Sequence, residues 1–132
     1  MIELDKFPKG KKDFTEFCKD NMQKWVNEIA KQQQVEPRQI TKEEAEVGVT
    51  GVFLSNPRIL YDFFDKQEIY VTVAPKDYDN IGEGWNYELI TSDHILNGGE
   101  QSKSRLEAEL EAFKHSFSIY ERGEYNKAPE EQ

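Results

Sequence analysis

The chain has 132 residues, a hydrophobic fraction of 36% and a formal net charge of −9 at pH 7. This length suits one domain, and an aromatic content of 12% excludes the disordered class, in which aromatic residues are scarce. The charge is uneven, because residues 1–34 hold six acids against seven bases while residues 35–132 hold twenty acids against ten bases. A surface this acidic repels the phosphates of nucleic acids, so direct nucleic-acid binding is not expected.

The ends of the chain and its cysteine content bear on domain organisation and location. Residues 1–12 contain Lys6, Lys9, Lys11 and Lys12. No apolar run follows them, so we expect neither a secretory signal nor a membrane span. We interpret residues 1–12 as a flexible basic leader, residues 13–125 as a single domain and residues 126–132 as an acidic tail. The single Cys18 cannot form an internal disulfide, which favours a reducing, cytoplasmic location.

The first predicted element is an amphipathic helix from about Asp13 to Gln34. Its apolar residues recur every three or four positions, and they are Phe14, Phe17, Cys18, Met22, Trp25, Val26, Ile29 and Ala30. A cysteine within this set is expected to be a buried, unreactive thiol. Asp13 followed by Glu16 has the spacing of a capping box, and Pro8 and Gly10 lie upstream, where we expect no helix yet.

The next segment, residues 35–48, is a polar connector with one helical signal. Thr41 and Glu44 have the spacing of a second capping box, which predicts a helix of one or two turns that ends at Gly48. Residues 49–54 are rich in β-branched and aromatic side chains, which predicts a strand.

A β-hairpin is predicted in the middle of the chain. Residues 69–74 and 85–91 combine β-branched and aromatic residues with alternation, and the ten residues between them suit a connecting loop. Just upstream, the apolar residues of segment 58–66 have helical spacing after a proline, although residues 59–64 could also form a strand. Both interpretations are left open.

The last predicted element is a helix of about twenty residues that ends near Gly123. Ser104 and Glu107 have capping-box spacing. The apolar residues that follow recur at spacings of four and three, and they are Leu106, Leu110, Phe113, Phe117 and Tyr120. Such a stripe could form a coiled-coil seam, which leaves a homodimer possible, but it covers only about two heptads, so packing on a sheet is expected.

These elements together predict an α+β fold. A small antiparallel sheet of about three strands would bury its apolar face against the N-terminal and C-terminal amphipathic helices, in two layers.

The loop at residues 77–88 carries the best local motif. Positions one, three, six and twelve of an EF-hand-like calcium loop are occupied by Asp77, Asp79, Gly82 and Glu88. Asp77, Asp79 and Glu88 are therefore candidate metal ligands. Against this, position five is Ile81, which offers no side-chain oxygen, and the flanking segments are predicted strands where an EF-hand needs helices. An ordinary hairpin loop is the favoured interpretation.

No constellation of catalytic residues accompanies the carboxylates. The two histidines, His94 and His115, lie 21 residues apart without cysteine partners, so a zinc site is not expected. His115 falls between Phe113 and Phe117, which turns it toward solvent in the predicted helix. His94 follows Asp93 in a predicted loop, and a hydrolase-like enzyme using it is the least favoured hypothesis. The glycines form no nucleotide-binding motif, so no cofactor is expected.

The leading hypothesis is a non-enzymatic binding or accessory protein whose acidic face docks on a basic protein surface, as nucleic-acid mimics and inhibitors from phages or mobile elements do. The candidate residues of this face are Asp77, Asp79, Glu83, Glu88, Asp93, Glu107 and Glu111. The alternatives are a calcium-binding module through the 77–88 loop, and a charge that only keeps the protein in solution.

Overall fold

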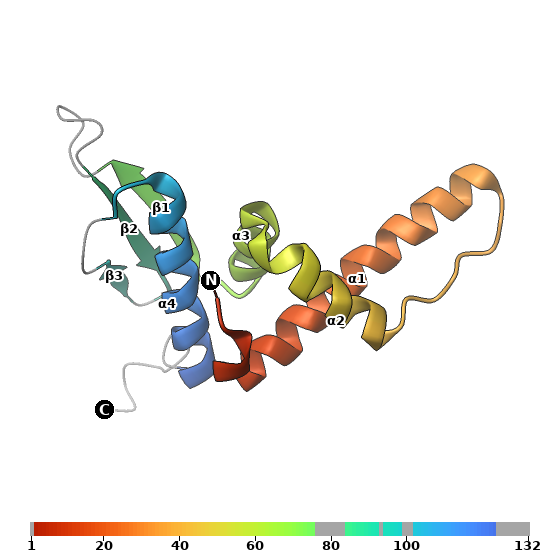
Figure 1. The fold of residues 1–132 in the computed structure, drawn as a ribbon, viewed down its shortest axis with the longest axis horizontal. Coiled ribbons are helices and arrows are strands. Elements are labelled where there is room, and N and C mark those ends of the chain that lie inside the picture. The colour runs from red at the N-terminus through yellow and green to blue at the C-terminus, as the bar shows by residue number, and fades with distance from the viewer. Residues whose placement is uncertain (1, 76–83, 93, 99–101, 124–132) are drawn as a thin grey trace.

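The computed structural model describes residues 2–75, 84–92, 94–98 and 102–123 (Figure 1). The helices are η1 (Leu4–Lys6), α1 (Pro8–Gln33), α2 (Lys42–Gly51), η2 (Phe53–Ser55), α3 (Pro57–Lys66) and α4 (Arg105–Arg122). The strands are β1 (Tyr70–Pro75), β2 (Trp85–Ile90) and β3 (Ile95–Asn97). The predicted α+β class, with a small antiparallel sheet and helices at both ends of the chain, is confirmed. None of the helices within the described ranges has the length and apolar content needed to cross a membrane.

The sheet has the strand order β1-β2-β3, and both neighbouring pairs are antiparallel. Strands β1 and β2 are the predicted hairpin, in which Tyr70 pairs with Ile90 and Thr72 pairs with Glu88. The third strand was not predicted. It has only three residues and begins at Ile95, which pairs with Ile90, so its segment is too short for a pattern of alternation.

Helix α4 lies against one face of the sheet (Figure 1). It begins and ends as predicted: the Ser104 hydroxyl accepts a hydrogen bond from the Glu107 amide at 3.1 Å, and Gly123 adopts the left-handed conformation at the C-cap. Phe113, Phe117 and Tyr120 of the predicted stripe are buried, whereas Leu106 in the first turn is exposed. The stripe belongs to the core and is not a free coiled-coil seam.

The centre of the core is a cluster of phenylalanine rings from three helices. Phe63 of α3 packs edge-on against Phe14 of α1 at a centroid distance of 5.2 Å, and Phe64 packs edge-on against Phe117 of α4 at 4.8 Å. These four rings are at most 1% exposed, so they hold α1 and α3 against α4.

The prediction that α1 starts at Asp13 is wrong, because the helix begins at Pro8. Proline is tolerated at the first helical position, where its missing N–H has no intrahelical partner. Asp13 is not a cap but accepts a hydrogen bond from the Tyr120 hydroxyl. Upstream, Ile2 and Leu4 are buried, so residues 2–12 belong to the folded domain and do not precede it as a leader.

The predicted strand at residues 49–54 is also wrong. Helix α2 carries the predicted Thr41–Glu44 capping box, but it continues through Gly48 to Gly51 and is followed by η2. Ala45 and Val49, four residues apart, are buried, and packing of this face against α1 outweighs the β-propensity of the segment. Residues 58–66, for which the sequence allows either a helix or a strand, are helical. They belong to α3, which has Asn56 as its N-cap.

Helix α1 extends well beyond the rest of the molecule. At 1.5 Å per residue its 26 residues make a helix about 39 Å long. Figure 1 shows its second half, together with the connection to α2, projecting away from the sheet and α4. The sheet and the tip of α1 therefore form opposite ends of the molecule.

Candidate functional site

No described element covers the face of the sheet opposite α4. Leu89 is buried and Tyr87 contacts His115 of α4, so these two side chains point toward α4. Because side chains alternate along a strand, their neighbours in sequence lie on the opposite face. We call it the open face, and its described members are Tyr70, Thr72 and Ala74 of β1, Asn86, Glu88 and Ile90 of β2, and Ile95 of β3.

One row of the open face is apolar on all three strands. Tyr70 pairs with Ile90, and Ile90 pairs with Ile95, so the three side chains are direct cross-strand neighbours. Their exposed fractions are 46%, 36% and 64%. Single exposed apolar residues are ordinary, but adjacent ones on a flat surface are typical of a contact site.

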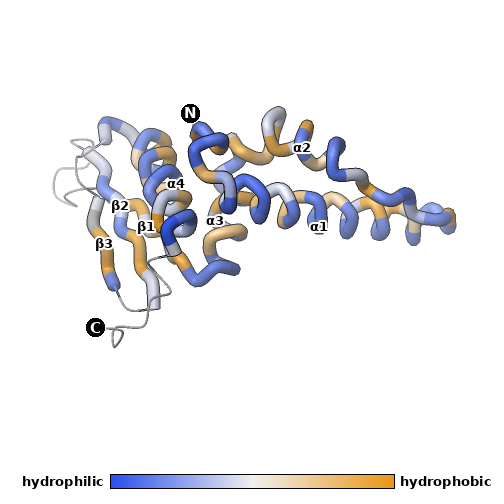
Figure 2. The backbone as a smooth tube through the Cα atoms, turned by 90° about the horizontal axis from the view of Figure 1, so that it is seen from below, coloured by the Kyte–Doolittle hydropathy of each residue, from blue (hydrophilic) through white to orange (hydrophobic). Residues whose placement is uncertain are grey.

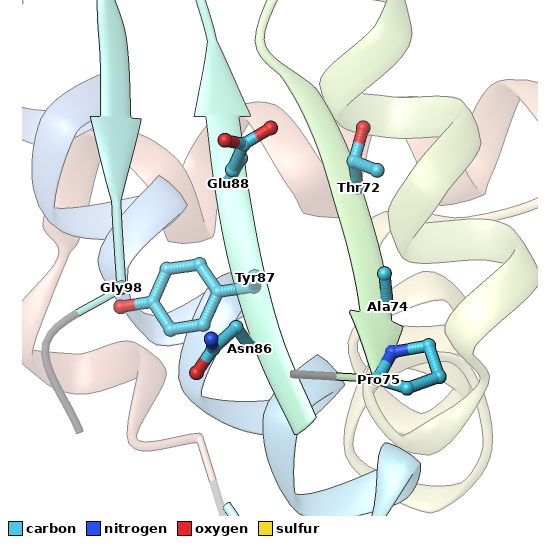
Figure 3. A pocket seen from close by; sticks show the side chains of 7 residues that line it. All are labelled: Thr72, Ala74, Pro75, Asn86, Tyr87, Glu88 and Gly98. Atoms are coloured by element: carbon cyan, nitrogen blue, oxygen red, sulfur yellow. The ribbon is translucent and has the colours of Figure 1, made fainter. Parts of the chain in front are cut away.

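Next to the apolar row the open face becomes polar and slightly hollow. A hollow of about 300 Å³ is lined by Thr72, Ala74, Pro75, Asn86, Tyr87, Glu88 and Gly98. Figure 3 shows Thr72 and Glu88 side by side on β1 and β2. Glu88 forms no ion pair with any residue in the described ranges, and the described members of the open face include no base. A hydroxyl, an amide and a carboxylate at one place suit a cationic group that donates hydrogen bonds.

The edge of the hollow is held by Tyr87. Its hydroxyl lies 3.1 Å from Nδ1 of His115, and a Cβ atom at Gly98 would lie only 2.6 Å from its ring. Burial lowers the pKa of His115, and Arg122 lowers it further, whereas burial and the charge of Glu111 raise the pKa of Tyr87. His115 was expected to face solvent, but it is half-buried and joins α4 to the sheet.

The residues of the predicted acidic face do not all lie together. Glu88 lies on the open face, whereas Glu107 and Glu111 lie on the exposed side of α4, with the sheet between them and Glu88. Glu107 accepts a hydrogen bond from the Lys103 amide at 3.2 Å, and Glu111 pairs with Lys114 at 3.2 Å. The other four candidates, Asp77, Asp79, Glu83 and Asp93, lie outside the described residues.

Sequence reasoning missed the apolar row. The alternation in residues 85–91 places Ile90 on the side of the strand opposite Leu89, but it does not place Tyr70 beside Ile90. The pattern does not say which face a helix covers, and Ile95 belongs to the strand that was not predicted.

The structure describes part of the residues behind the two alternative hypotheses. Of the candidate metal ligands only Glu88 is described; it lies within β2, and the segments that flank the loop are strands, not the helices of an EF-hand. Over the described ranges, His, Cys, Asp and Glu form no group of three that could hold a metal ion. His94 is exposed, and its carbonyl accepts a hydrogen bond from the Thr91 amide at 2.9 Å.

Two further hollows lie beside each other between η1, α1 and α2, with volumes of about 290 and 400 Å³. Both are lined by Lys11, Thr15 and Glu46, and Lys11 is already paired with Asp5 at 2.6 Å. Both hollows are lined by charges of both signs, so neither presents a lining of a single sign to a ligand.

No family model matches the chain, and neither a curated protein nor a solved structure is similar to it.

Proposed function

We propose that this chain is a non-enzymatic binding protein that docks a basic segment of a partner protein on its open face. The observation that carries the proposal is the contiguity of the apolar row Tyr70, Ile90 and Ile95 with the hollow beside Glu88. The row offers apolar contact area, and the hollow offers a carboxylate without an ion-pair partner among the described residues.

The two halves of the open face have different roles in this proposal. Covering the half-exposed side chains of the row contributes on the order of 1 kcal/mol each through the hydrophobic effect. A lysine or arginine seated against Glu88 adds a charge-assisted hydrogen bond and fixes the register of the partner. The excess of ten acids over residues 35–132 attracts a basic partner from a distance and speeds association at low salt.

This proposal keeps the sequence-based hypothesis of a basic partner and moves the contact from a purely acidic face to a mixed apolar and acidic one. It includes a cytoplasmic location, which the single Cys18 supports because no internal disulfide can form. Membrane binding and direct nucleic-acid binding are not part of it.

The test is affinity capture with matched pairs of variants as bait, at low and high salt. The first pair compares Ile90→Thr/Ile95→Thr on the open face with Val47→Thr/Leu106→Thr, on α2 and in the first turn of α4, where the two side chains are also exposed. The second pair compares Glu88→Gln with Glu111→Gln. We expect one partner to be lost with the open-face variants, retained with both controls, and weakened by salt.

Two results would contradict the proposal. A partner that binds all four variants equally does not use the open face. A partner that is lost with Glu111→Gln but not with Glu88→Gln uses the exposed side of α4. Circular dichroism of each variant separates loss of binding from loss of fold.

A further inference from the structure

The second half of α1 carries an apolar stripe that the described part of the chain covers only in part. Phe14, Cys18, Trp25 and Ile29 share one side of the helix, because their spacings of four, seven and four residues keep them aligned. Phe14 and Cys18 are buried in the core, whereas Trp25 is 55% exposed and Ile29 is 53% exposed. The stripe thus continues past the body of the protein, and Figure 2 shows apolar positions recurring along the projecting part of α1.

The projecting half of α1 is supported from a different side. The Gln23 side chain donates to the Arg38 carbonyl at 3.0 Å and accepts from the Ile40 amide at 2.8 Å. Ile40 and Ala30 are buried where this connection runs along the helix. The helix is therefore held in place by its own return segment, and the side with Trp25 and Ile29 is left free and preorganised for binding.

Contact with Phe53 also orients the Trp25 ring. Its ring lies 6.2 Å from the ring of Phe53, at the start of η2, and the neighbouring Val52 is 58% exposed. The exposed apolar surface therefore extends from α1 onto the end of α2. We call Trp25, Ile29 and Val52 the arm patch.

The charges beside the arm patch indicate what kind of partner it binds. Lys24 and Glu28 lie one helical turn apart on the flank of the stripe, both exposed, and they form no ion pair with each other or with any residue in the described ranges. The order of lysine before glutamate is the weaker one for pairing within a helix, so both side chains stay available to a neighbour.

We propose that the arm patch binds a second copy of this chain, with the two α1 helices antiparallel about a two-fold axis at the level of residue 26. Such an axis places Lys24 and Glu28 at equal distances on either side, so Glu28 of each chain meets Lys24 of the other. Trp25 and Ile29 of the two chains pack together beside these ion pairs. A two-fold contact must be self-complementary, and an apolar stripe flanked by opposite charges one turn apart meets that condition.

This inference goes beyond the proposed function, since it concerns the opposite end of the molecule from the open face (Figure 1). The experiment is sedimentation equilibrium of the full chain over a range of concentrations, with charge-reversal variants. We expect a dimer whose dissociation constant rises about tenfold in Lys24→Glu and in Glu28→Lys, because each variant faces two like-charged pairs.

The decisive step is restoration of the charge pairs. The double variant Lys24→Glu/Glu28→Lys exchanges the two charges and recovers dimerisation. An equimolar mixture of the two single variants forms a heterodimer, in which every Glu faces a Lys. Lys12 and Glu16 provide the matched control, because they have the same spacing in the first half of α1 and are also exposed. Reversing either of these charges leaves the dissociation constant unchanged.

Three outcomes overturn the proposal: a chain that stays monomeric at all concentrations, a dimer that is indifferent to both single reversals, or a failure of the mixture to recover association. The substituted side chains are exposed and make no ion pairs with described residues, so helix content measured by circular dichroism is expected to stay the same in every variant. A helix content that falls only in the single reversals would also overturn the charge-pairing argument.

Discussion

Glu121 in the last turn of α4 caps the first turn of α1. Its two carboxylate oxygens accept hydrogen bonds from the Lys9 amide at 3.1 Å and the Gly10 amide at 2.9 Å. Helix α1 has no side-chain cap of its own, because Phe7 occupies the N-cap position. A residue more than one hundred positions away therefore does what a local serine or aspartate does in most helices.

We expect Glu121→Ala to lower the free energy of unfolding by about 1 kcal/mol, the usual cost of losing a helix cap. A glutamate in the last turn of its own helix opposes the α4 dipole, so the loss at α1 is partly offset. Urea denaturation measures the change. Glu16→Ala is the control, because Glu16 is exposed on α1 and lies outside the capped turn. An equal effect of the two substitutions would mean that Glu121 does not act as a cap.

Burial lowers the reactivity of the Cys18 thiol. The side chain is 1% exposed, and burial raises the pKa of its thiol from 9.0 to about 12. We expect no reaction of the native protein with a disulfide reagent at pH 8, and complete reaction after unfolding in urea. Rapid labelling of the native protein would show that the thiol reaches solvent.

The same shift has a consequence for stability at alkaline pH. The unfolded chain loses the thiol proton near pH 9, while the native state keeps it up to about pH 12. Stability from this group is therefore present below pH 9 and is lost as the pH rises toward 12. Cys18→Ala is expected to show a smaller fall in the free energy of unfolding between pH 8 and 10 than the unmodified chain, measured by urea denaturation.

His115 gives the opposite dependence at acid pH. Burial and Arg122 hold its pKa below the ordinary value of 6.5, so the unfolded chain binds the proton first as the pH falls. The stability that neutral His115 provides is present above pH 6.5 and is lost progressively below it. We expect His115→Gln to reduce the loss of stability between pH 7.5 and 5.5. Urea denaturation at both pH values, in a His94→Gln background, isolates this contribution.

At the scale of elements, Gly10 determines how closely α1 and α4 approach each other. A Cβ atom at this position would lie 2.9 Å from the Phe117 ring, which is fully buried. Alanine in place of a helical glycine normally stabilises by up to about 1 kcal/mol, but a forced shift in a packed core costs about 1–3 kcal/mol. We expect the second effect to win, so Gly10→Ala destabilises the protein.

Gly51 is the matched control for this prediction. It also lies in a helix, at the end of α2, but a Cβ atom there would meet no other atom within 4 Å. Gly51→Ala is therefore expected to raise the melting temperature, whereas Gly10→Ala lowers it. If both substitutions raised it, the Phe117 ring would have room to move, and the close approach of α1 and α4 would not depend on glycine.

The predictability of each element follows from where its stabilising contacts lie. The start of α4 and that of α2 were predicted, because Ser104 and Thr41 are local caps whose partners lie three residues away. The start of α1 was not, because its cap is Glu121. The strand predicted at residues 49–54 failed for a similar reason: Val49 is buried on the side of α2 that packs against α1, a contact that the local pattern does not contain.

The candidate site was predictable only in part. The hairpin and the exposure of Glu88 followed from alternation and composition. The open face required knowledge that α4 covers only one side of the sheet, that α1 packs on α4, and that α3 contacts both β1 and α4. The arm patch could not be predicted from the sequence, because the apolar stripe of α1 has the same spacing along its whole length although only its first half is buried.

For the whole molecule, the two proposed contact surfaces lie at opposite ends (Figure 1). The open face lies beyond α4, and the arm patch lies on the projecting half of α1. A dimer formed through the arm patches would therefore keep the two sheets apart and leave both open faces free to bind.

Bivalency is the consequence that can be measured. A dimer with two free open faces binds an immobilised basic partner through both sites, so its release is slower than that of a single site, by as much as 10²-fold or more where the spacing permits. We expect Lys24→Glu to speed release from a surface densely coated with the captured partner, and to leave the affinity for the same partner free in solution unchanged. Biolayer interferometry at high and low surface density, together with titration calorimetry, separates the two quantities. A variant that weakens both equally would link the arm patch to the open face directly, whereas one that weakens neither would mean that the two sites of a dimer cannot reach the surface together.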